Sequence, residues 1–542
     1  MSRRTSITVE AGDGEPTTLH AGAGAGMLSQ VLAEHGFPLN TRCGQRGLCR
    51  GCEIDLQQGS LRVGESEVAA PATLRACRAR LHGPVAIAIP ARSRIEHKPQ
   101  VGETYEISVP HAHDPFFPAT GTRDTAFAVD IGTTTVVVLL VDLVSGETLA
   151  RAGGFNAQIR FGDNVLTRID AARTPEAIAA MQRSVVCDTL APLLLQACER
   201  AGRDPSRIAG GAIAGNTTML HLLAGEDPTP LGTAPFTARF LAEKAVLAED
   251  IRLAARGLPA RTPIRLLPSI AGYIGADITA GVYATGMMFD AEPGLLVDIG
   301  TNGEIVLQHG GVLTACAAAA GPAFEGCGLR CGTRAREGAV SELAVTRDPF
   351  EIRMRTIGGI APARASGICG SAYIDFLAGA RGCGLLGHAG RFDAAAWNAL
   401  PERFRVTDDG ERALSLAGPG SPCISEVDVA VLLQAKAAIG AGIETLLETA
   451  GIRAGEISRL YLAGGFGMHL DVANAIATGL LPGFRPEQVR VVGNTSLAGA
   501  LLALTDRATL AEMEKLREKV RVIELNLSDG FEDRYVEHLM LP

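Results

Sequence analysis

The sequence of 542 residues lacks the marks of a secreted, membrane-spanning or nucleic-acid-binding protein. Its first four residues, MSRR, run directly into a polar stretch without the apolar core of a secretory signal. The best candidate for a membrane span, 126–144, is interrupted by Asp130 and Asp142. The formal net charge of −9 argues against a dedicated nucleic-acid binder. We therefore expect a cytoplasmic protein that binds neither a membrane nor nucleic acid.

The chain also lacks the composition of a disordered protein and that of a small disulfide scaffold. Hydrophobic residues make up 47% and charged residues 20% of the chain, which is enough for several buried cores. The twelve cysteines are not arranged like those of a small secreted domain. Neither a Walker loop nor a Rossmann G-x-G-x-x-G motif is recognisable, so any nucleotide site must be built differently. The length predicts about three or four domains.

The N-terminal region predicts a small α+β domain. Residues 26–35 have helical spacing, and Gly36 can end that helix. Strand-like segments lie at 5–9, 53–56 and 85–89. We place this domain at 1–92 and interpret 93–123, which is rich in proline and has little periodicity, as a linker.

From residue 124 onward, strands alternate with helices, which is typical of an α/β fold. FAVDIGTTTVVVLLVDL at 127–143 predicts two strands joined by a tight turn, and GLLVDIGTNGEIVLQHGG at 294–311 repeats the pattern. This internal similarity predicts two related halves. We place a middle domain at 124–206 and a C-terminal domain at 207–542.

The strongest chemical signal is the segment CGQRGLCRGC at 43–52, with one more cysteine after 24 intervening residues. Four thiolates are what a two-iron cluster needs, two for each iron. The candidate ligands are Cys43, Cys49, Cys52 and Cys77. A structural zinc site usually has two C-x2-C knuckles, of which one is recognisable here, and cytosolic disulfides are rare. The spacing therefore favours a 2Fe–2S cluster over zinc or a disulfide.

Two Asp-Ile-Gly-Thr turns each end an apolar strand with a carboxylate and continue into a hairpin with hydroxyl or amide side chains. Backbone N–H groups and hydroxyls in such turns can cradle phosphates, while the aspartate can hold Mg²⁺ or orient the attacking water. The first turn contains Asp130, Gly132, Thr133 and Thr134, and the second contains Asp298, Gly300, Thr301, Asn302 and Gly303. Two such turns that face each other would clamp a triphosphate from both sides.

A third glycine-rich segment follows a predicted strand near the C-terminus. Its glycines, Gly464, Gly465 and Gly467, allow the backbone to approach a flat adenine and ribose. Three further residues, Glu325, Ser366 and Ser371, stand in glycine-rich strings where packing or helix capping explains each as well as a function does.

In this order the motifs resemble the superfamily of acetate and sugar kinases, actin and the heat-shock ATPases. More narrowly, the chain resembles the reductive activators of corrinoid proteins, and the resemblance covers nearly the whole length. The matching strings are the cysteine segment, DIGTTT at 130–135, FGDNVLTRI at 161–169, GNTTMLHLL at 215–223, DIGTNGEI at 298–305, AAGPAFEG at 319–326, GICGSAYID at 367–375, AGGFG at 463–467 and GNTSLAGA at 493–500.

The resemblance implies a multidomain protein, with a β-grasp 2Fe–2S ferredoxin domain followed by a two-lobed, actin-like (ribonuclease-H-like) α/β ATPase. Such activators pass one electron through the cluster, coupled to ATP and Mg²⁺, to the corrinoid protein of a methyltransferase system and return Co(II) to Co(I). By matched motif, the four cysteines would hold the cluster, Asp130 and Asp298 would be catalytic, and the two turns and three glycines would bind the nucleotide. A reduced ferredoxin or flavoprotein as electron donor and a homodimer are also implied.

Three other functions remain open from the sequence. The nucleotide motifs alone fit a small-molecule kinase with an attached redox domain. They also fit an activator of radical dehydratases, which holds a 4Fe–4S cluster between two subunits. A carrier or scaffold that binds ATP without hydrolysing it is the non-enzymatic alternative.

Overall fold

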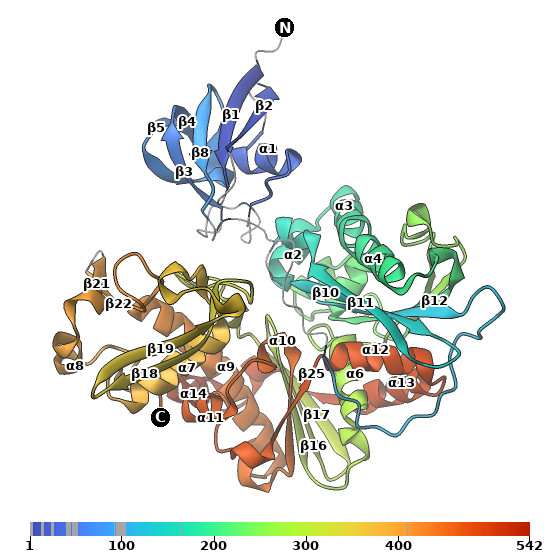
Figure 1. The fold of residues 1–542 in the computed structure, drawn as a ribbon. Coiled ribbons are helices and arrows are strands. Elements are labelled where there is room, and N and C mark those ends of the chain that lie inside the picture. The colour runs from blue at the N-terminus through green and yellow to red at the C-terminus, as the bar shows by residue number, and fades with distance from the viewer. Residues whose placement is uncertain are drawn as a thin grey trace. The chain divides into compact units, whose positions relative to one another are not determined.

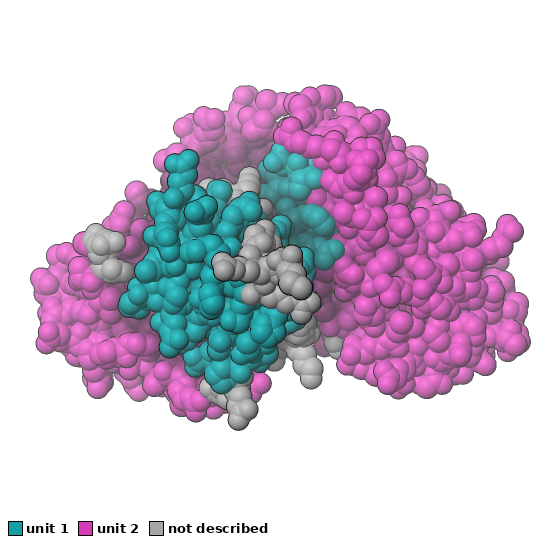
Figure 2. Space-filling model, turned by 90° about the horizontal axis from the view of Figure 1, so that it is seen from above, with its two compact units in different colours: residues 1–97, 158–171 teal, residues 98–157, 172–542 magenta. Residues whose placement is uncertain are grey.

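The computed structural model describes residues 4–11, 16–22, 26–39, 45, 52–90, 93, 104–162, 164–408 and 410–542. The chain divides into two units, which Figure 2 shows in different colours. Unit 1 comprises residues 1–97 and 158–171, and unit 2 comprises residues 98–157 and 172–542. Two of the expected cluster ligands, Cys43 and Cys49, lie outside the described residues.

Unit 1 contains a small mixed sheet with one helix in the same core (Figure 1). Its strand order is β2-β1-β8-β3-β6, in which β1 pairs parallel with β8 and the other pairs are antiparallel. Leu28 and Leu32 of the helix are fully buried with Ile7 and Ile54 of the sheet. A second, three-stranded sheet has the order β5-β4-β7. The predicted α+β character of this region is thus confirmed.

The elements of unit 1 are β1 (Arg4–Glu10), β2 (Thr17–Gly22), α1 (Leu28–Glu34), β3 (Glu53–Gln58), β4 (Ser60–Val63), β5 (Ser66–Ala69), β6 (Ala72–Arg75), the short helix η1 (Ala76–Arg78), β7 (Ala79–Arg80), β8 (Val85–Ala88) and α2 (Val165–Ala171).

Unit 2 is built around two six-stranded sheets that share the same order over five strands, whereas the sixth strand, β13 or β26, lies at opposite edges of the two sheets. In the first sheet, β9, β10 and β11 form an antiparallel meander, and β12 pairs parallel with β9 and with β14. In the second, β15, β16 and β17 form the meander, and β24 pairs parallel with β15 and with β25. This equivalence confirms the predicted two related halves. The division expected at residue 207 falls within the first sheet, because β12 pairs with β9.

The strands of these sheets are β9 (Thr125–Ile131), β10 (Thr135–Asp142), β11 (Thr148–Phe155), β12 (Ile208–Gly215), β13 (Lys244–Leu247), β14 (Pro263–Leu266), β15 (Gly294–Ile299), β16 (Gly303–His309), β17 (Val312–Ala318), β24 (Arg459–Ala463), β25 (Val489–Gly493) and β26 (Arg521–Val522). Smaller sheets contain β18 (Ala339–Arg347), β19 (Phe350–Thr356) and β20 (Gly367–Ile368), and β21 (Arg405–Asp408), β22 (Glu411–Ser415) and β23 (Cys423–Ser425).

The helices of unit 2 are α3 (Pro175–Val185), a π-helical turn (Val186–Leu190), α4 (Ala191–Ala201), α5 (Thr217–Ala224), α6 (Ala276–Thr285), α7 (Gly370–Gly382), α8 (Ala394–Ala399), α9 (Glu426–Ala450), α10 (Gly464–Gly467), α11 (Val472–Ala477), α12 (Thr495–Thr505), α13 (Thr509–Lys519) and α14 (Phe531–His538).

The paired helices α6 and α12 lie between the two large sheets (Figure 1). Helix α12 packs on β9 and β12 of the first sheet, although it directly follows β25 of the second. Apolar residues of α6 share a core with Leu296 and Val306 of the second sheet. The junction between β25 and α12 is therefore the point where the chain crosses from one half of unit 2 to the other.

Helix α9 is the longest helix of unit 2 among the described residues. Ser425 and Asp428 form a capping box at its start, and Gly451 ends it in a left-handed conformation. By length and composition alone α9 could cross a membrane, as could the stretch Pro175–Ala201. In α9, 78% of the apolar window is buried inside the protein, so it serves as a core helix here.

The described part of the expected linker, residues 104–123, runs along unit 2 as an ordered strap (Figure 1). Its backbone exchanges hydrogen bonds with the end of β25, with α6 and with the last turn of α12. The N–H of Asn494 donates to the carbonyl oxygen of Thr104 at 3.0 Å, and the N–H of Glu106 donates to that of Val492 at 3.0 Å. This segment is therefore held on unit 2 by backbone hydrogen bonds, which need no periodic pattern of side chains.

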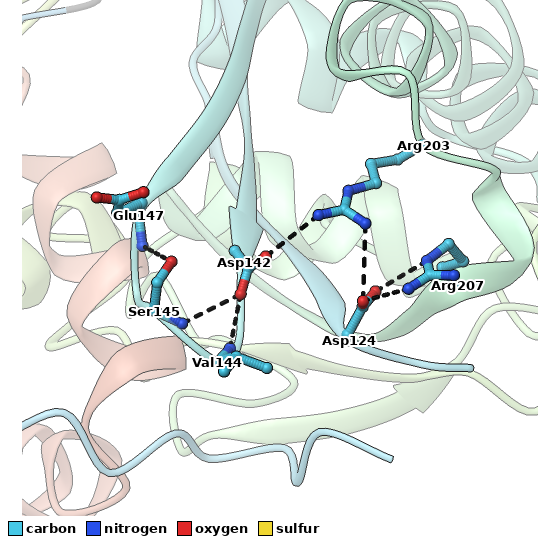
Figure 3. Close-up of polar contacts among 7 residues, drawn as sticks. All are labelled: Asp124, Asp142, Val144, Ser145, Glu147, Arg203 and Arg207. Carbon is cyan, nitrogen blue, oxygen red and sulfur yellow. Dashed lines mark hydrogen bonds and ion pairs between the residues drawn. The ribbon is translucent and has the colours of Figure 1, made fainter. Parts of the chain in front are cut away.

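An ion-pair network joins the strand ends of the first sheet that lie away from the Asp-Ile-Gly-Thr turn (Figure 3). Arg207 pairs with Asp124 at the start of β9, and Arg203 pairs with both Asp124 and Asp142. Asp142 also accepts hydrogen bonds from two backbone N–H groups of the next turn. These contacts fix the connection between α4 and β12 to the β9–β10 hairpin, so that the turn at the other end is held by a rigid frame.

Lys436, in the middle of α9, gives the fold a measurable pH dependence. Its side chain is fully buried, and Nζ donates a hydrogen bond to the carbonyl oxygen of Met540 at 2.8 Å. Burial disfavours the ammonium form and lowers the pKa of Lys436 from 10.5 to about 8. Between these two values the unfolded chain binds more protons than the folded one, so the free energy of unfolding rises with pH there.

We expect the free energy of unfolding of the wild type, relative to that of Lys436→Met, to increase by on the order of 2 kcal/mol between pH 7 and pH 10. Denaturant unfolding at several pH values measures this difference. Lys515→Met, which removes an exposed lysine paired with Glu512, is the matched control and should show no such trend. Parallel pH curves for the wild type and Lys436→Met would contradict the prediction.

Candidate functional site

Both Asp-Ile-Gly-Thr turns line one cavity of about 1140 Å³ in unit 2. Asp130 is the last residue but one of β9, and Asp298 holds the same place in β15. In each turn the glycine N–H closes the hairpin at 2.9 Å, from Gly132 to Thr135 and from Gly300 to Asn302. Because the two halves have the same strand order, the equivalent strand ends meet at one opening. The expectation that the turns face each other agrees with this geometry.

Of the predicted turn residues, Gly303 is not part of the cavity wall. A Cβ at Gly303 would lie 2.8 Å from the side chain of Ile439 in α9, so this glycine faces the core. The other predicted turn residues line the cavity: Asp130, Gly132, Thr133, Thr134, Asp298, Gly300, Thr301 and Asn302.

The three glycines of the third segment have three different surroundings. Gly464 has φ +88°, and a Cβ there would lie 2.5 Å from the carbonyl oxygen of Ile299, so this glycine permits close packing against the second turn. Gly465 lines the cavity with open space where a Cβ would point. Gly467 packs against Leu462 and is not part of the cavity wall. Gly464 and Gly465 thus line the cavity and Gly467 does not, and the adenosine-binding role expected of the three glycines stays a prediction.

Four carboxylates meet at the floor of the cavity, of which the sequence predicted two. Asp277, in the first turn of α6, and Glu304, on β16, join Asp130 and Asp298. Burial, and then the charge of Asp130, raise the pKa of Asp298 to about 7. Burial and then the charges of Asp298 and Asp130 raise the pKa of Asp277 to about 8. Like charges at this spacing repel, and a divalent cation would relieve that repulsion.

Asp130 is held in place by the start of α12. The side-chain amide of Asn494 donates to Asp130 at 2.9 Å, and the hydroxyl of Ser496 donates at 2.8 Å. These hydrogen bonds favour the carboxylate form, whereas burial is the larger effect and raises the pKa of Asp130. Asn494 also caps α12 through the N–H of Leu497. The side chain of Asn494 thus joins the start of α12 to the first Asp-Ile-Gly-Thr turn.

The first half of unit 2 carries an equivalent asparagine. Asn216 caps α5 through the N–H of Met219 and donates to the hydroxyl of Thr133 at 3.0 Å. Both asparagines follow a strand-ending glycine, in the strings GNTT and GNTS. The repetition of Gly-Asn-Thr in the two halves was the signal that could have identified them as site residues.

Glu325 lies between the two turns. It accepts a hydrogen bond from the hydroxyl of Thr134 at 2.7 Å and another from the hydroxyl of Thr301 at 2.6 Å. Ser371 also lines the cavity, where its hydroxyl donates to the carbonyl oxygen of Ser341 at 2.9 Å. Ser366 instead donates to the carbonyl oxygen of Glu337 and is not part of the cavity wall. Of these three candidates, Glu325 is the one that contacts both Asp-Ile-Gly-Thr turns.

The cavity extends from the two turns toward β18, β19 and α11, where it has room for a nucleoside. Met354 and Arg355 of β19 form one side, and Asp471 and Asn474 at the start of α11 form the other. Asn474 donates to the buried carboxylate of Asp375 at 2.8 Å. None of these residues belongs to a local motif, so the sequence did not predict this part of the cavity.

In unit 1 the described pair of candidate cluster ligands comes together. Cys52 immediately precedes β3, Cys77 lies in η1, and both are buried. The N–H of Ala76 donates to the carbonyl oxygen of Cys52 at 3.0 Å, which ties the two segments together. A hydrogen bond between the thiols, together with burial, raises the pKa of Cys52. Two of the four predicted thiols therefore lie side by side, as ligands of one cluster must.

The chain matches two family models that together cover most of unit 2 and also residues 158–171 of unit 1. One is described as the RACo middle region and matches residues 125–290. The other is described as the C-terminal domain of RACo, the ASKHA domain, and matches residues 292–542. Both place the division near residue 291, at the start of the second sheet, rather than at residue 207. The actin-like ATPase fold of this region is thereby confirmed.

Curated relatives and a solved structure carry related names. A corrinoid activation enzyme, RamQ, from Eubacterium limosum is 32% identical over 76% of this chain and 70% of its own length. The [Co(II) methylated amine-specific corrinoid protein] reductase of Methanosarcina barkeri is 28% identical over 76% of this chain and 75% of its own length. The solved structure of a reductive activator for a corrinoid, iron–sulfur protein is 29% identical, with a TM-score of 0.72 over 99% of this chain and 98% of that one. The chain therefore belongs to the family of the reductive activators of corrinoid proteins.

Proposed function

We propose that this chain reactivates the corrinoid protein of a methyltransferase system by delivering one electron to its cobalt, from Co(II) to Co(I), in a reaction driven by ATP hydrolysis. One observation carries the proposal. The cavity of unit 2 unites two phosphate-binding turns and a cluster of carboxylates, within a chain whose relatives are named as corrinoid activators. The ATP site and the cysteine pair together supply the two parts that such a reaction needs.

We infer that different residues of the cavity bind ATP and take part in its hydrolysis. The hydroxyls and backbone N–H groups of the two turns donate to the phosphates, and the open wall at Gly465 accommodates the nucleoside. Mg²⁺ that enters with ATP would neutralise phosphate charge when bound, and Asp130 and Asp298 would hold it through bound water. Asp130, oriented by Asn494 and Ser496, and Asp298 are placed to position the attacking water.

The cysteines of unit 1 fit a 2Fe–2S cluster. Cys52 and Cys77 are adjacent and buried, and Cys43 and Cys49 complete a set of four thiolates in the sequence. Bound there, the cluster would supply single electrons. We infer that this region is a β-grasp ferredoxin domain, that a reduced ferredoxin or flavoprotein delivers its electron, and that the protein works in the cytoplasm as a homodimer.

ATP hydrolysis can supply free energy that the electron transfer to cobalt requires. Each ~59 mV by which a one-electron donor falls short of its acceptor lowers the equilibrium constant tenfold. A plant-type 2Fe–2S centre lies near about −400 mV, which limits the electron transfers it can drive alone. A protein that binds its partner differently before and after hydrolysis can add the missing free energy. The two halves of unit 2, which meet at the ATP cavity, form the natural two-state element.

The strap is attached next to the residue that orients Asp130 in this cavity. Asn494 contacts Asp130 through its side chain and Thr104 through its backbone N–H. Gly493, with φ +74°, lies so close that a Cβ would be 2.3 Å from the carbonyl oxygen of Thr104. A rotation of one half of unit 2 about this junction would therefore move the start of the strap.

We expect ATP hydrolysis by the wild type to be stimulated by a Co(II) corrinoid protein and to be reduced on the order of 100-fold in Asp298→Asn. The substitution removes the carboxylate charge but keeps the shape of the side chain. Phosphate release, measured under anaerobic conditions with and without the partner, tests both statements. Asp533→Asn, on the exposed face of α14, is the matched control and should behave as the wild type. Equal rates with and without the partner would count against the proposal.

We expect Cys77→Ser to lose most of the iron, the sulfide and the visible absorption of the purified protein, because it removes one of four thiolate ligands. Its ATP hydrolysis without the partner should persist, since the nucleotide cavity lies in unit 2, while the reduction of Co(II) should stop. Iron and sulfide analysis after anaerobic purification, with Cys383→Ser as control, provides the measurement. Full iron content in Cys77→Ser would exclude this cysteine as a ligand.

A further inference from the structure

Glu325 links the two phosphate turns directly. One carboxylate oxygen accepts from Thr134 in the first turn at 2.7 Å, and the other accepts from Thr301 in the second at 2.6 Å. Thr134 belongs to the first half of unit 2 and Thr301 to the second. The carboxylate of Glu325 therefore holds the two sides of the cavity together.

The position of Glu325 is fixed by its neighbours in the chain. It ends the short helix η9 (Pro322–Glu325), whose Phe324 is buried and stacks on Phe466 of α10 with ring centroids 4.8 Å apart. The carboxylate itself is only 16% exposed. Because η9 is anchored against the glycine-rich segment, Glu325 is directed into the gap between the turns rather than toward solvent.

The guanidinium of Arg334 lies beside the carboxylate of Glu325. Arg334 Nε lies 3.4 Å from Glu325, and its guanidinium lies over the ring of Phe155 at 5.3 Å, at the end of β11. Arg334 Nε is buried, and within the described residues it makes no hydrogen bond. An arginine with unused donor capacity beside a carboxylate can exchange that partner for a phosphate, which it can bind through two parallel hydrogen bonds.

The hydrogen bonds of Thr134 and Thr301 conflict with their role in phosphate binding. A threonine hydroxyl has a single proton to donate. While both protons are directed at Glu325, neither hydroxyl can donate to a phosphate oxygen. A nucleotide that is to use both hydroxyls must therefore displace Glu325 from both of them.

We propose that the carboxylate of Glu325 takes the place of the terminal phosphate of ATP while the cavity is free of nucleotide. It joins the two turns through Thr134 and Thr301 and pairs with Arg334; the terminal phosphate then replaces it at all three contacts. When phosphate leaves after hydrolysis, Glu325 returns and joins the two turns again. Glu325 is thus a positioning residue that competes with the substrate, and this inference rests on the proposed function because it takes ATP as the ligand.

The test compares the wild type, Glu325→Gln and Glu325→Ala in calorimetric titrations with ATP and with ADP. A neutral or shortened side chain competes less well for the two hydroxyls, so ATP should bind about tenfold more tightly to both variants. ADP, which lacks the terminal phosphate, should change by less than about twofold. Hydrogen exchange without nucleotide should become faster at residues 130–135 and 298–303 in both variants, because the link between the turns is weakened.

Glu448→Gln is the matched control, since Glu448 is an exposed carboxylate that also pairs with an arginine, Arg534. It should leave both affinities and the exchange rates unchanged. Unchanged or weaker ATP binding in Glu325→Gln would overturn the inference, as would an equal change for ATP and ADP, which a purely structural role predicts. A wild type that binds no ATP would overturn the proposed function as well, whereas tight wild-type binding that Glu325→Gln does not improve would overturn this inference alone.

Discussion

Repulsion among carboxylates at the floor of one cavity is the constraint on which the rest of unit 2 depends. The repeated strand order brings Asp130 and Asp298 to the same opening, and Asp277 and Glu304 add two more acidic groups. Each of these side chains is enclosed by protein yet faces the cavity. Burial raises the pKa of all four groups, and the neighbouring acidic groups raise the pKa values of Asp277, Asp298 and Glu304 as well. A ligand that brings a divalent cation with it would offset this cost. The hydrogen bonds from Asn494 and Ser496 fix the orientation of Asp130.

The crossing between the two halves of unit 2 is also the point where the strap is attached. Helix α12 packs on the first sheet although it continues from β25 of the second, so Gly493 and Asn494 stand where the two halves join. Thr104 is hydrogen-bonded at this crossing, and Glu106 forms an ion pair with Arg490 on β25. A closing motion of the halves would therefore act on the strap at its beginning, before it reaches α6 and the end of α12.

The parts of the site that could be predicted from the sequence are those in which the chemistry is local. A strand, a carboxylate and a glycine turn follow one another around Asp130 and again around Asp298, and the repetition itself indicated the two related halves. Asp277 could not be predicted, because it begins a helix far from either turn and only the tertiary fold brings it to them. The close contact of Gly464 with the second turn could not be predicted either, because it depends on the tertiary fold. The same holds for the pairing of β12 with β9 across residue 207, because a parallel crossover through helices resembles a domain boundary when only the order of elements is known.

The two halves of unit 2 do not contribute identical groups to the cavity. Both halves supply an aspartate, a hydroxyl turn and a capping asparagine, and such a symmetric clamp would grip a triphosphate equally from both sides. Glu325 and Arg334 come from the second half alone, yet they reach Thr134 and Phe155 of the first. An anion from one half that binds both turns holds them in one specific arrangement. Two arrangements that differ in which anion joins the turns are what a cycle of binding, hydrolysis and release requires, because each step then exchanges one set of contacts for another.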